Sequence, residues 1–244
     1  MARDRSQAKD NRSPFRREAR ASVEGMPPPG SEVIVIGLGR FGSALADTLV
    51  ELGHQVLGVD ADPDIVQDAL GRLAHAVQMD ATNARALEQL GVKDFQVAVV
   101  SIGSDIEASI LTTAALADVG IPRIWAKAIT ESHGRILERV GAHHVVFPEH
   151  DMGQRVAHLV TGRMMDYIEL DEGFALVETT APAHAVGKTL GEAGIRAQYG
   201  VTVVCIKPSG QPFTYATPET VIEAQDILLV AGAKKQAEDF ANKA

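Results

Sequence analysis

Between Glu32 and Glu149, short apolar runs alternate with stretches that repeat at helical spacing. The apolar runs predict strands at 33–36, 55–59, 75–79, 97–101, 123–127 and 144–147. The stretches between them predict helices near 43–52, 63–71, 83–90, 106–119 and 131–140. This alternation favours βαβ units with right-handed crossovers. We therefore expect an α/β fold, with a Rossmann-like, doubly wound parallel sheet over residues 31–149.

The pattern changes after this region. Residues 150–167 are expected to form a linking and dimerisation helix, because apolar residues recur at helical spacing from Asp151 to Tyr167. The apolar positions of this helix are Met152, Val156, Leu159, Val160 and Met164. Further on, the sequence predicts strands at 174–179, 201–207 and 227–231, and a helix over Thr189–Ala197. We expect residues 168–244 to form a small α+β domain whose thin core favours dimerisation.

Residues 1–30 have a different character. They carry seven Lys or Arg against four Asp or Glu, a local charge of +3, and include the run Pro27-Pro28-Pro29. They show no apolar periodicity and lack the apolar segment of a signal peptide. This composition predicts a disordered, solubilising tail, and contact with a membrane surface or a partner is the alternative.

Charge and composition narrow the functional classes. The net charge of −9 argues against sequence-independent nucleic-acid binding, which needs a basic surface. The single cysteine, Cys205, excludes an intramolecular disulfide, and its apolar neighbours indicate a core thiol. No run of 18 or more apolar residues occurs, so we expect a protein that does not span a bilayer and is cytoplasmic.

The first predicted strand runs directly into the sequence Gly37-Leu38-Gly39-Arg40-Phe41-Gly42. In this G-x-G-x-x-G pattern, Gly37 permits a tight turn, Gly39 lets backbone N–H groups approach a phosphate, and Gly42 allows close packing of helix on sheet. The helix that follows presents unpaired N–H donors and the positive end of its dipole. The loop therefore predicts an anion-binding site.

Asp60 ends the second predicted strand, about 20 residues after the glycines, where a ribose-binding carboxylate belongs. The alternative is that Asp60 caps the next helix. Asp62 is the better cap because it precedes Pro63, and proline favours the first helical position. We therefore expect Asp60 to bind the ribose hydroxyls of an adenosine nucleotide and to repel the 2′-phosphate of NADP(H).

Ligands of doubly wound sheets collect at the carboxyl ends of the strands. Arg40 is expected to reach a terminal phosphate, and Lys127 is a second candidate for a phosphate contact. The alternative for each is a solvated surface side chain. Glu149 would repel a triphosphate unless a cation lay between them, so we expect it to hold Mg²⁺ or another cation together with the nucleotide.

These motifs, with Met79-Asp80-Ala81-Thr82, Ser101-Ile102-Gly103, Trp125-Ala126-Lys127-Ala128 and Phe147-Pro148-Glu149, resemble an RCK domain. More closely, residues 32–240 resemble the cytosolic regulatory subunit of bacterial Ktr/Trk potassium-uptake systems, with TrkA-N and TrkA-C domains. Val186-Gly187-Lys188-Thr189-Leu190 and Arg196-Ala197-Gln198-Tyr199-Gly200 carry the resemblance in the second half. Asp80 and Ser101 are expected nucleotide contacts because they lie at carboxyl ends of predicted strands, and the resemblance adds Ala81 and Ile102.

The resemblance implies a protein that is not an enzyme. Such subunits form homodimers that assemble into an octameric ring beneath a membrane-embedded potassium channel or transporter subunit of the KtrB/TrkH type. ATP favours their active state and ADP the inactive one, and NAD(H) binds in some members. The implied location is cytoplasmic, peripheral at the inner face of the cell membrane.

The resemblance also implies a second ligand. Cyclic di-AMP binds the C-terminal domain of several members at its dimer interface, and here Arg196, Lys207 and Pro208 are the candidate residues. A two-fold symmetric interface with one arginine from each chain suits a ligand with two phosphates. A dimer interface without a ligand is the alternative.

Two other functions stay open at this point. An NAD-dependent oxidoreductase would use the C-terminal domain for its substrate, but the sequence has no Tyr-x-x-x-Lys pair, no H-E-x-x-H and no clear acid–base pair. The neighbours His143 and His144 point to opposite faces of a strand and cannot share a metal. A free-standing redox regulator that senses NADH is the second alternative.

Overall fold

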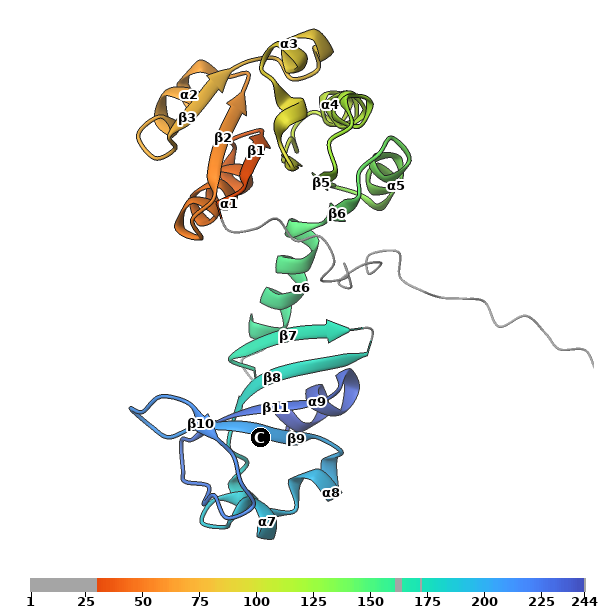
Figure 1. Cartoon of the computed structure of the whole chain (residues 1–244). Helices are drawn as coiled ribbons and strands as arrows, with labels where there is room; N and C mark the ends of the chain where they lie inside the picture. The colour runs from red at the N-terminus through yellow and green to blue at the C-terminus, as the bar shows by residue number, and fades with distance from the viewer. Residues whose placement is uncertain (1–29, 161–163, 172, 244) are drawn as a thin grey trace, which may run out of the picture. The chain divides into compact units, whose positions relative to one another are not determined.

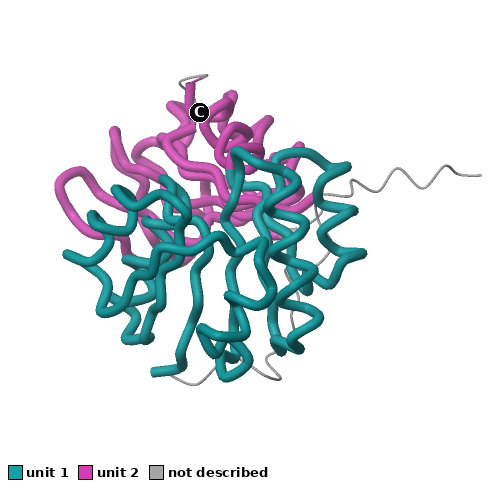
Figure 2. Tube along the Cα trace, turned by 90° about the horizontal axis from the view of Figure 1, so that it is seen from above, with its two compact units in different colours: residues 1–148 teal, residues 149–244 magenta. Residues whose placement is uncertain are grey.

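Six parallel strands form the sheet of the first unit, in the order β3-β2-β1-β4-β5-β6. Residues 30–160, 164–171 and 173–243 are described by this computed structural model, which divides into two units, residues 1–148 and 149–244 (Figure 2). The predicted disordered tail, residues 1–30, lies outside the described residues except for Gly30. The six strands are β1 (Glu32–Ile36), β2 (Gln55–Asp60), β3 (His75–Gln78), β4 (Val97–Val100), β5 (Arg123–Lys127) and β6 (His144–Val146).

Helices cover both faces of this sheet (Figure 1). In β1, Ile34 and Ile36 pack into one buried cluster, and Val33 and Val35 pack into another on the opposite face. The first cluster includes apolar residues of α3, α4 and α5, and the second includes residues of α1 and α2. The helices are α1 (Arg40–Glu51), α2 (Pro63–Ala69), α3 (Ala84–Gln89), α4 (Ile106–Val119) and α5 (Glu131–Arg139), with a short η2 (Val92–Asp94) before β4. The predicted Rossmann-like fold is confirmed.

The second unit contains an antiparallel sheet of five strands in the order β10-β9-β11-β8-β7. Its core combines apolar residues of this sheet with Ala237, Phe240 and Ala241 of the last helix. The strands are β7 (Asp166–Asp171), β8 (Phe174–Thr180), β9 (Thr202–Lys207), β10 (Thr214–Tyr215) and β11 (Ile227–Ala233). The helices are α6 (Pro148–Val160), η3 (Ala183–Ala185), α7 (Leu190–Ala193), α8 (Ile195–Tyr199) and α9 (Lys234–Ala241). The small α+β domain is therefore confirmed.

The predicted helix from Asp151 to Tyr167 is wrong at its C-terminal end. Asp166 and Tyr167 belong to β7, and Met164 is buried in the core of the second unit. On α6 itself, Met152, Val156 and Val160 of the predicted stripe are exposed, whereas Leu159 is partly buried. Within the described residues, only part of the stripe is therefore exposed.

The predicted helix Thr189–Ala197 is interrupted. Gly194 has a φ of +57°, a left-handed conformation that ends α7 and precedes α8. Across the described part of the chain, no helix has the length and apolar character needed to cross a bilayer.

Candidate functional site

The glycine loop joins β1 to α1 at the centre of the parallel sheet. Gly37 has a φ of +91°, and its N–H donates to the Val59 carbonyl at 2.8 Å, which ties the turn to β2. At Gly42, an added Cβ would collide with the Gly37 carbonyl oxygen and lie 2.5 Å from the Ser101 Oγ. Only glycine therefore fits at Gly42, as the motif predicts.

The start of α1 is open toward a ligand. Gly39 is the N-cap residue, and among the described residues no side chain caps the N–H groups of the first turn, which also carries no acidic residue. A Cβ at Gly39 would meet nothing within 4 Å, so space lies in front of the loop. Unpaired N–H groups beside open space suit a phosphate, which also gains from the positive end of the helix dipole.

Asp60 holds the same loop from the end of β2. Its Oδ2 accepts the Leu38 N–H at 2.6 Å, and its Oδ1 accepts the Asp62 N–H at 2.9 Å. Asp62 caps α2, because its side chain accepts the Asp64 N–H at 2.9 Å. The assignment of the cap to Asp62 is thus confirmed, and Asp60 keeps further lone pairs for ribose hydroxyls.

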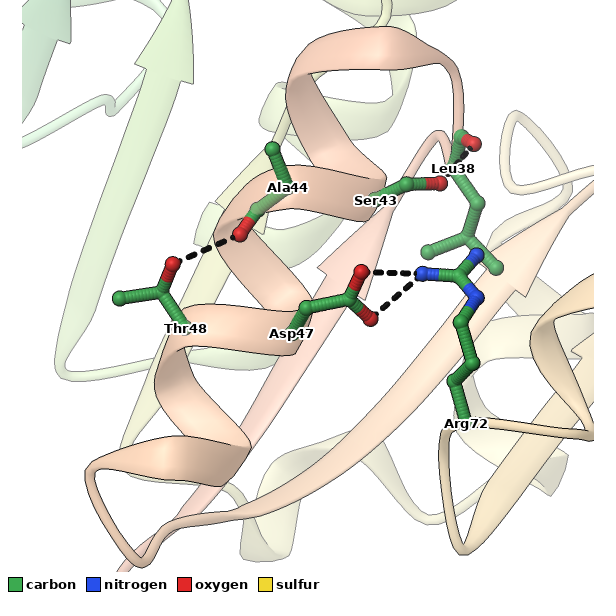
Figure 3. A network of polar contacts seen from close by, with 6 residues as sticks. All are labelled: Leu38, Ser43, Ala44, Asp47, Thr48 and Arg72. Atoms are coloured by element: carbon green, nitrogen blue, oxygen red, sulfur yellow. Dashed lines mark hydrogen bonds and ion pairs between the residues drawn. The ribbon is translucent and has the colours of Figure 1, made fainter.

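Other polar contacts fix α1 below the loop (Figure 3). The Ser43 hydroxyl donates to the Leu38 carbonyl at 2.5 Å, and Thr48 donates to the Ala44 carbonyl at 2.9 Å. Arg72, just beyond α2, forms an ion pair with Asp47 of α1. These contacts brace the helix whose N-terminus would face the phosphate.

Ser101 lies beneath the glycine loop, immediately after β4. It is buried, and its Oγ lies 3.0 Å from the Ile36 carbonyl oxygen and closer still to that of Gly37. Its N–H also donates to the Ile36 carbonyl at 2.8 Å. The hydroxyl is therefore turned toward the loop backbone, which makes Ser101 a support for the turn.

Lys127 is the last residue of β5, and its side chain approaches Phe41 of the glycine loop. It is buried, and its Nζ lies 5.7 Å from the centre of the Phe41 ring. A Cβ at Gly103 would lie only 2.9 Å from that Nζ, so Gly103 provides room for the lysine. The spacing of the motifs did not predict this role of Gly103. Its position just past the end of a strand is the feature of the sequence that could have indicated it.

The remaining expected contacts differ in exposure. Arg40 is exposed on the first turn of α1, while Leu38 and Ala81 are buried in the apolar core and Ile102 packs against it. Asp80 is exposed, and hydrogen bonds from the Thr82 hydroxyl and N–H hold the pKa of its carboxyl below the usual value. Asp80 thus orders its own turn after β3.

The candidate cation residue, Glu149, is exposed in the first turn of α6 and belongs to the second unit. Within the described residues, no group of three or more His, Cys, Asp or Glu side chains is arranged to hold a metal ion.

The three C-terminal candidates lie at two ends of one strand. Arg196 is exposed on α8, before β9 begins, whereas Lys207 ends β9 and Pro208 follows it. Six residues of strand span roughly 20 Å. The Lys207 Nζ lies 5.5 Å from the centre of the Phe213 ring. A single chain therefore does not gather the three residues around one phosphate.

The fold resembles that of RCK domains in solved structures. The GsuK RCK domain matches with a TM-score of 0.62 and 21% identity, over 89% of this chain and 48% of that chain. A structure described as the GsuK channel bound to NAD matches with a TM-score of 0.61 over 88% of this chain and 40% of that one. These matches show that the chain shares the fold of those RCK domains.

Sequence comparison gives the family. The TrkA-N domain matches residues 33–148 and the TrkA-C domain matches residues 174–244. Ktr system potassium uptake protein C of Bacillus subtilis (strain 168) is 40% identical over 203 residues, which are 83% of this chain and 92% of that protein. Ktr system potassium uptake protein A of the same strain is 37% identical over 210 residues, 86% of this chain and 95% of that protein. The chain belongs to the Ktr/Trk family of potassium-uptake proteins with RCK domains.

Proposed function

We propose that this chain is a cytosolic, nucleotide-sensing regulatory subunit that gates a membrane-embedded potassium channel or transporter subunit of the KtrB/TrkH type. Its family and the names of its relatives support a role in potassium uptake. The observation that carries nucleotide sensing is the open, uncapped N-terminus of α1 at Gly39, held in place by Asp60.

Adenine nucleotides are the proposed ligands, with ATP and ADP favouring different states. Asp60 accepts hydrogen bonds from the ribose hydroxyls, and the N–H groups of the glycine loop receive the phosphates. Arg40 is exposed at the same helix end and has the length to reach a terminal phosphate. Glu149 takes part through Mg²⁺ or another cation bound to the phosphates.

NAD(H) is the second candidate ligand. A structural neighbour of this chain is described as the GsuK channel bound to NAD, and the open loop accepts a pyrophosphate as well as a triphosphate. An NADH-reading redox regulator or an NAD-dependent oxidoreductase would use the same loop. The oxidoreductase is the weaker alternative because the sequence motifs offer no clear acid–base pair.

The proposed assembly is a homodimer that builds an octameric ring at the inner face of the membrane. The exposed stripe Met152, Val156 and Val160 on α6 gives such a dimer an apolar contact surface. Cyclic di-AMP is the proposed second ligand at the C-terminal dimer interface. Arg196 from each protomer would meet one of its phosphates, and Lys207 and Pro208 would line a different part of the interface.

Calorimetric titration of the full chain with ATP, ADP, NADH and NADPH tests the nucleotide assignment. Asp60→Asn should weaken ATP and ADP binding about 10- to 100-fold, the cost of a charge-assisted hydrogen bond. The matched control is Asp62→Asn, which removes the adjacent charge but keeps a good N-cap. NADPH should bind poorly because Asp60 repels its 2′-phosphate.

Unchanged affinity in Asp60→Asn would exclude this residue from the ribose site. Hydride transfer from NADH to any added carbonyl substrate would favour the oxidoreductase. For the second ligand, cyclic di-AMP is titrated into the full chain and into Arg196→Ala. No binding at ~100 μM, well above the micromolar scale, would leave dimerisation as the role of this interface.

A further inference from the structure

Three elements of the second unit meet at His158, near the end of α6. Its ring stacks on the Tyr167 ring of β7, with the centroids 4.0 Å apart and the planes at 22°. Its Nε2 lies 3.9 Å from Glu238 Oε1 of α9. All three residues belong to one unit, so their arrangement is fixed within it. His158 therefore joins the linking helix to both the edge strand and the last helix.

The carboxylate of Glu238 has an oxygen at this junction that a positive charge would stabilise. Its Oε1 is buried and has no hydrogen-bond partner among the described residues. A buried carboxylate oxygen without a donor is costly, and 3.9 Å is too long for a hydrogen bond from His158. A protonated imidazole would bring a positive charge to that oxygen.

The cations nearest His158 are already paired with other carboxylates. On α6, Arg155 binds Asp166 of β7 through two hydrogen bonds of 2.8 Å and 2.7 Å. This pairing holds the pKa of the Asp166 carboxyl below its ordinary value. On α9, the Lys234 Nζ lies 3.3 Å from Glu169 Oε2 of β7. Among the ion pairs of the described residues, Glu238 has His158 as its partner.

The aromatic partner favours the same charge state. The Tyr167 ring is buried against His158, and its hydroxyl lies 3.4 Å from Glu169 Oε2. A cation over the face of a tyrosine ring is attracted by the ring electrons. His158 therefore contacts both an aromatic face and a carboxylate, two groups that attract a cation.

We propose that His158 is a pH-sensitive clamp: its protonation tightens the contact of α6 with β7 and α9. An imidazole is the side chain that changes charge between pH 5 and 8, so acidification through this range closes the clamp and alkalinisation loosens it. Because α6 begins two residues after β6 ends, the stiffness of α6 bears on how a signal passes from the nucleotide-binding unit. This consequence rests on the proposed function, whereas the clamp itself does not.

Hydrogen exchange of the nucleotide-free full chain tests the clamp, at about pH 6 and pH 8 and corrected for intrinsic exchange rates. In the wild type, the α6 amides should be about two- to fivefold better protected at the lower pH, as expected for a partly exposed ion pair. Glu238→Gln and His158→Gln should each abolish that difference. Glu238→Gln keeps the side-chain shape, so it separates loss of charge from loss of packing.

The matched control is His184→Gln. His184 is another histidine of the same unit beside an aromatic ring, and the centroids of the His184 and Tyr199 rings are 5.8 Å apart. It should keep the wild-type pH difference. A wild-type protein without this difference, or a Glu238→Gln variant that retains it, would overturn the proposal. Nucleotide is absent throughout, so failure of the clamp is distinguishable from failure of nucleotide sensing, which the calorimetric titration measures separately.

Discussion

At the scale of single residues, two neighbouring aspartates have separate roles. Asp62 caps α2 through the Asp64 N–H, and Asp60 holds the glycine loop through the Leu38 N–H. We predict that Asp62→Ala lowers the free energy of unfolding by about 0.5–2 kcal/mol, the usual cost of losing an N-cap, and leaves nucleotide affinity unchanged. Denaturant unfolding with parallel calorimetry measures both; a large loss of affinity would contradict the division of roles.

Arg40 is predicted to separate ATP from ADP. It is exposed in the first turn of α1, and the proposed function assigns it to the terminal phosphate of ATP. Arg40→Ala should weaken ATP binding about 10- to 100-fold and ADP binding much less, because one charge-assisted contact is lost. Arg72→Ala is the control, since Arg72 pairs with Asp47 of the same helix. Equal weakening of both nucleotides in Arg40→Ala would show that this side chain does not read the terminal phosphate.

The sequence predicted the glycines of the loop, but it did not predict the contact that Ser101 makes with the loop backbone. Gly37 and Gly42 follow from the motif because each has a steric reason that a spacing pattern carries. Ser101 stays a predicted nucleotide contact, and its hydroxyl also faces the Gly37 carbonyl, a contact that spacing did not predict. The orientation of the Ser101 hydroxyl depends on how the end of β4 packs against the glycine loop. This packing is a tertiary property, and spacing along the chain does not predict it.

At the scale of elements, the strands of the parallel sheet were predictable because they are continuous apolar runs between capped helices. Asn83, Asp105 and Thr130 each cap a helix through their side chains. β7 was missed because Ile168 and Leu170 face outward and Tyr167 inward, an alternation that a preceding helical spacing obscured. α9 was missed because it has few apolar residues. Their role, as for Phe240, is to pack on the C-terminal sheet, which helical spacing alone does not indicate.

The pair of α6 with β7 gives a prediction of pH dependence. Arg155 hydrogen bonds lower the pKa of Asp166, so this carboxylate stabilises the fold above the ordinary carboxyl pKa. That stability is lost as the pH falls through the lowered folded-state pKa. Both side chains are partly exposed, so the contribution is below about 1 kcal/mol. Urea unfolding from about pH 6 down to pH 3 should show a smaller acid-induced loss in Asp166→Asn than in the wild type. Asp118→Asn, at an exposed position of α4, is the control and should behave as the wild type.

At the scale of the whole molecule, the chain has separate cores. Each of the three clusters of buried apolar side chains lies within one unit: two in the parallel-sheet unit and one in the C-terminal unit. Units with independent cores can unfold in separate steps, which breaks two-state behaviour. We therefore expect two thermal transitions for the full chain.

ATP should then act mainly on the transition of the first unit. A ligand that binds only the folded first unit adds about 2.7 kcal/mol at 100 times its Kd, which raises that transition by on the order of 10 °C. The second transition should shift much less, because the glycine loop and Asp60 lie in the first unit, and only Glu149, through a cation, is proposed to contact ATP from the second. Scanning calorimetry with and without saturating ATP measures this, and Asp60→Asn is the control that should lose most of the shift. A shift of both transitions by the same amount would mean instead that the two units unfold as one cooperative body, with α6 rigidly coupling the nucleotide loop to the C-terminal core.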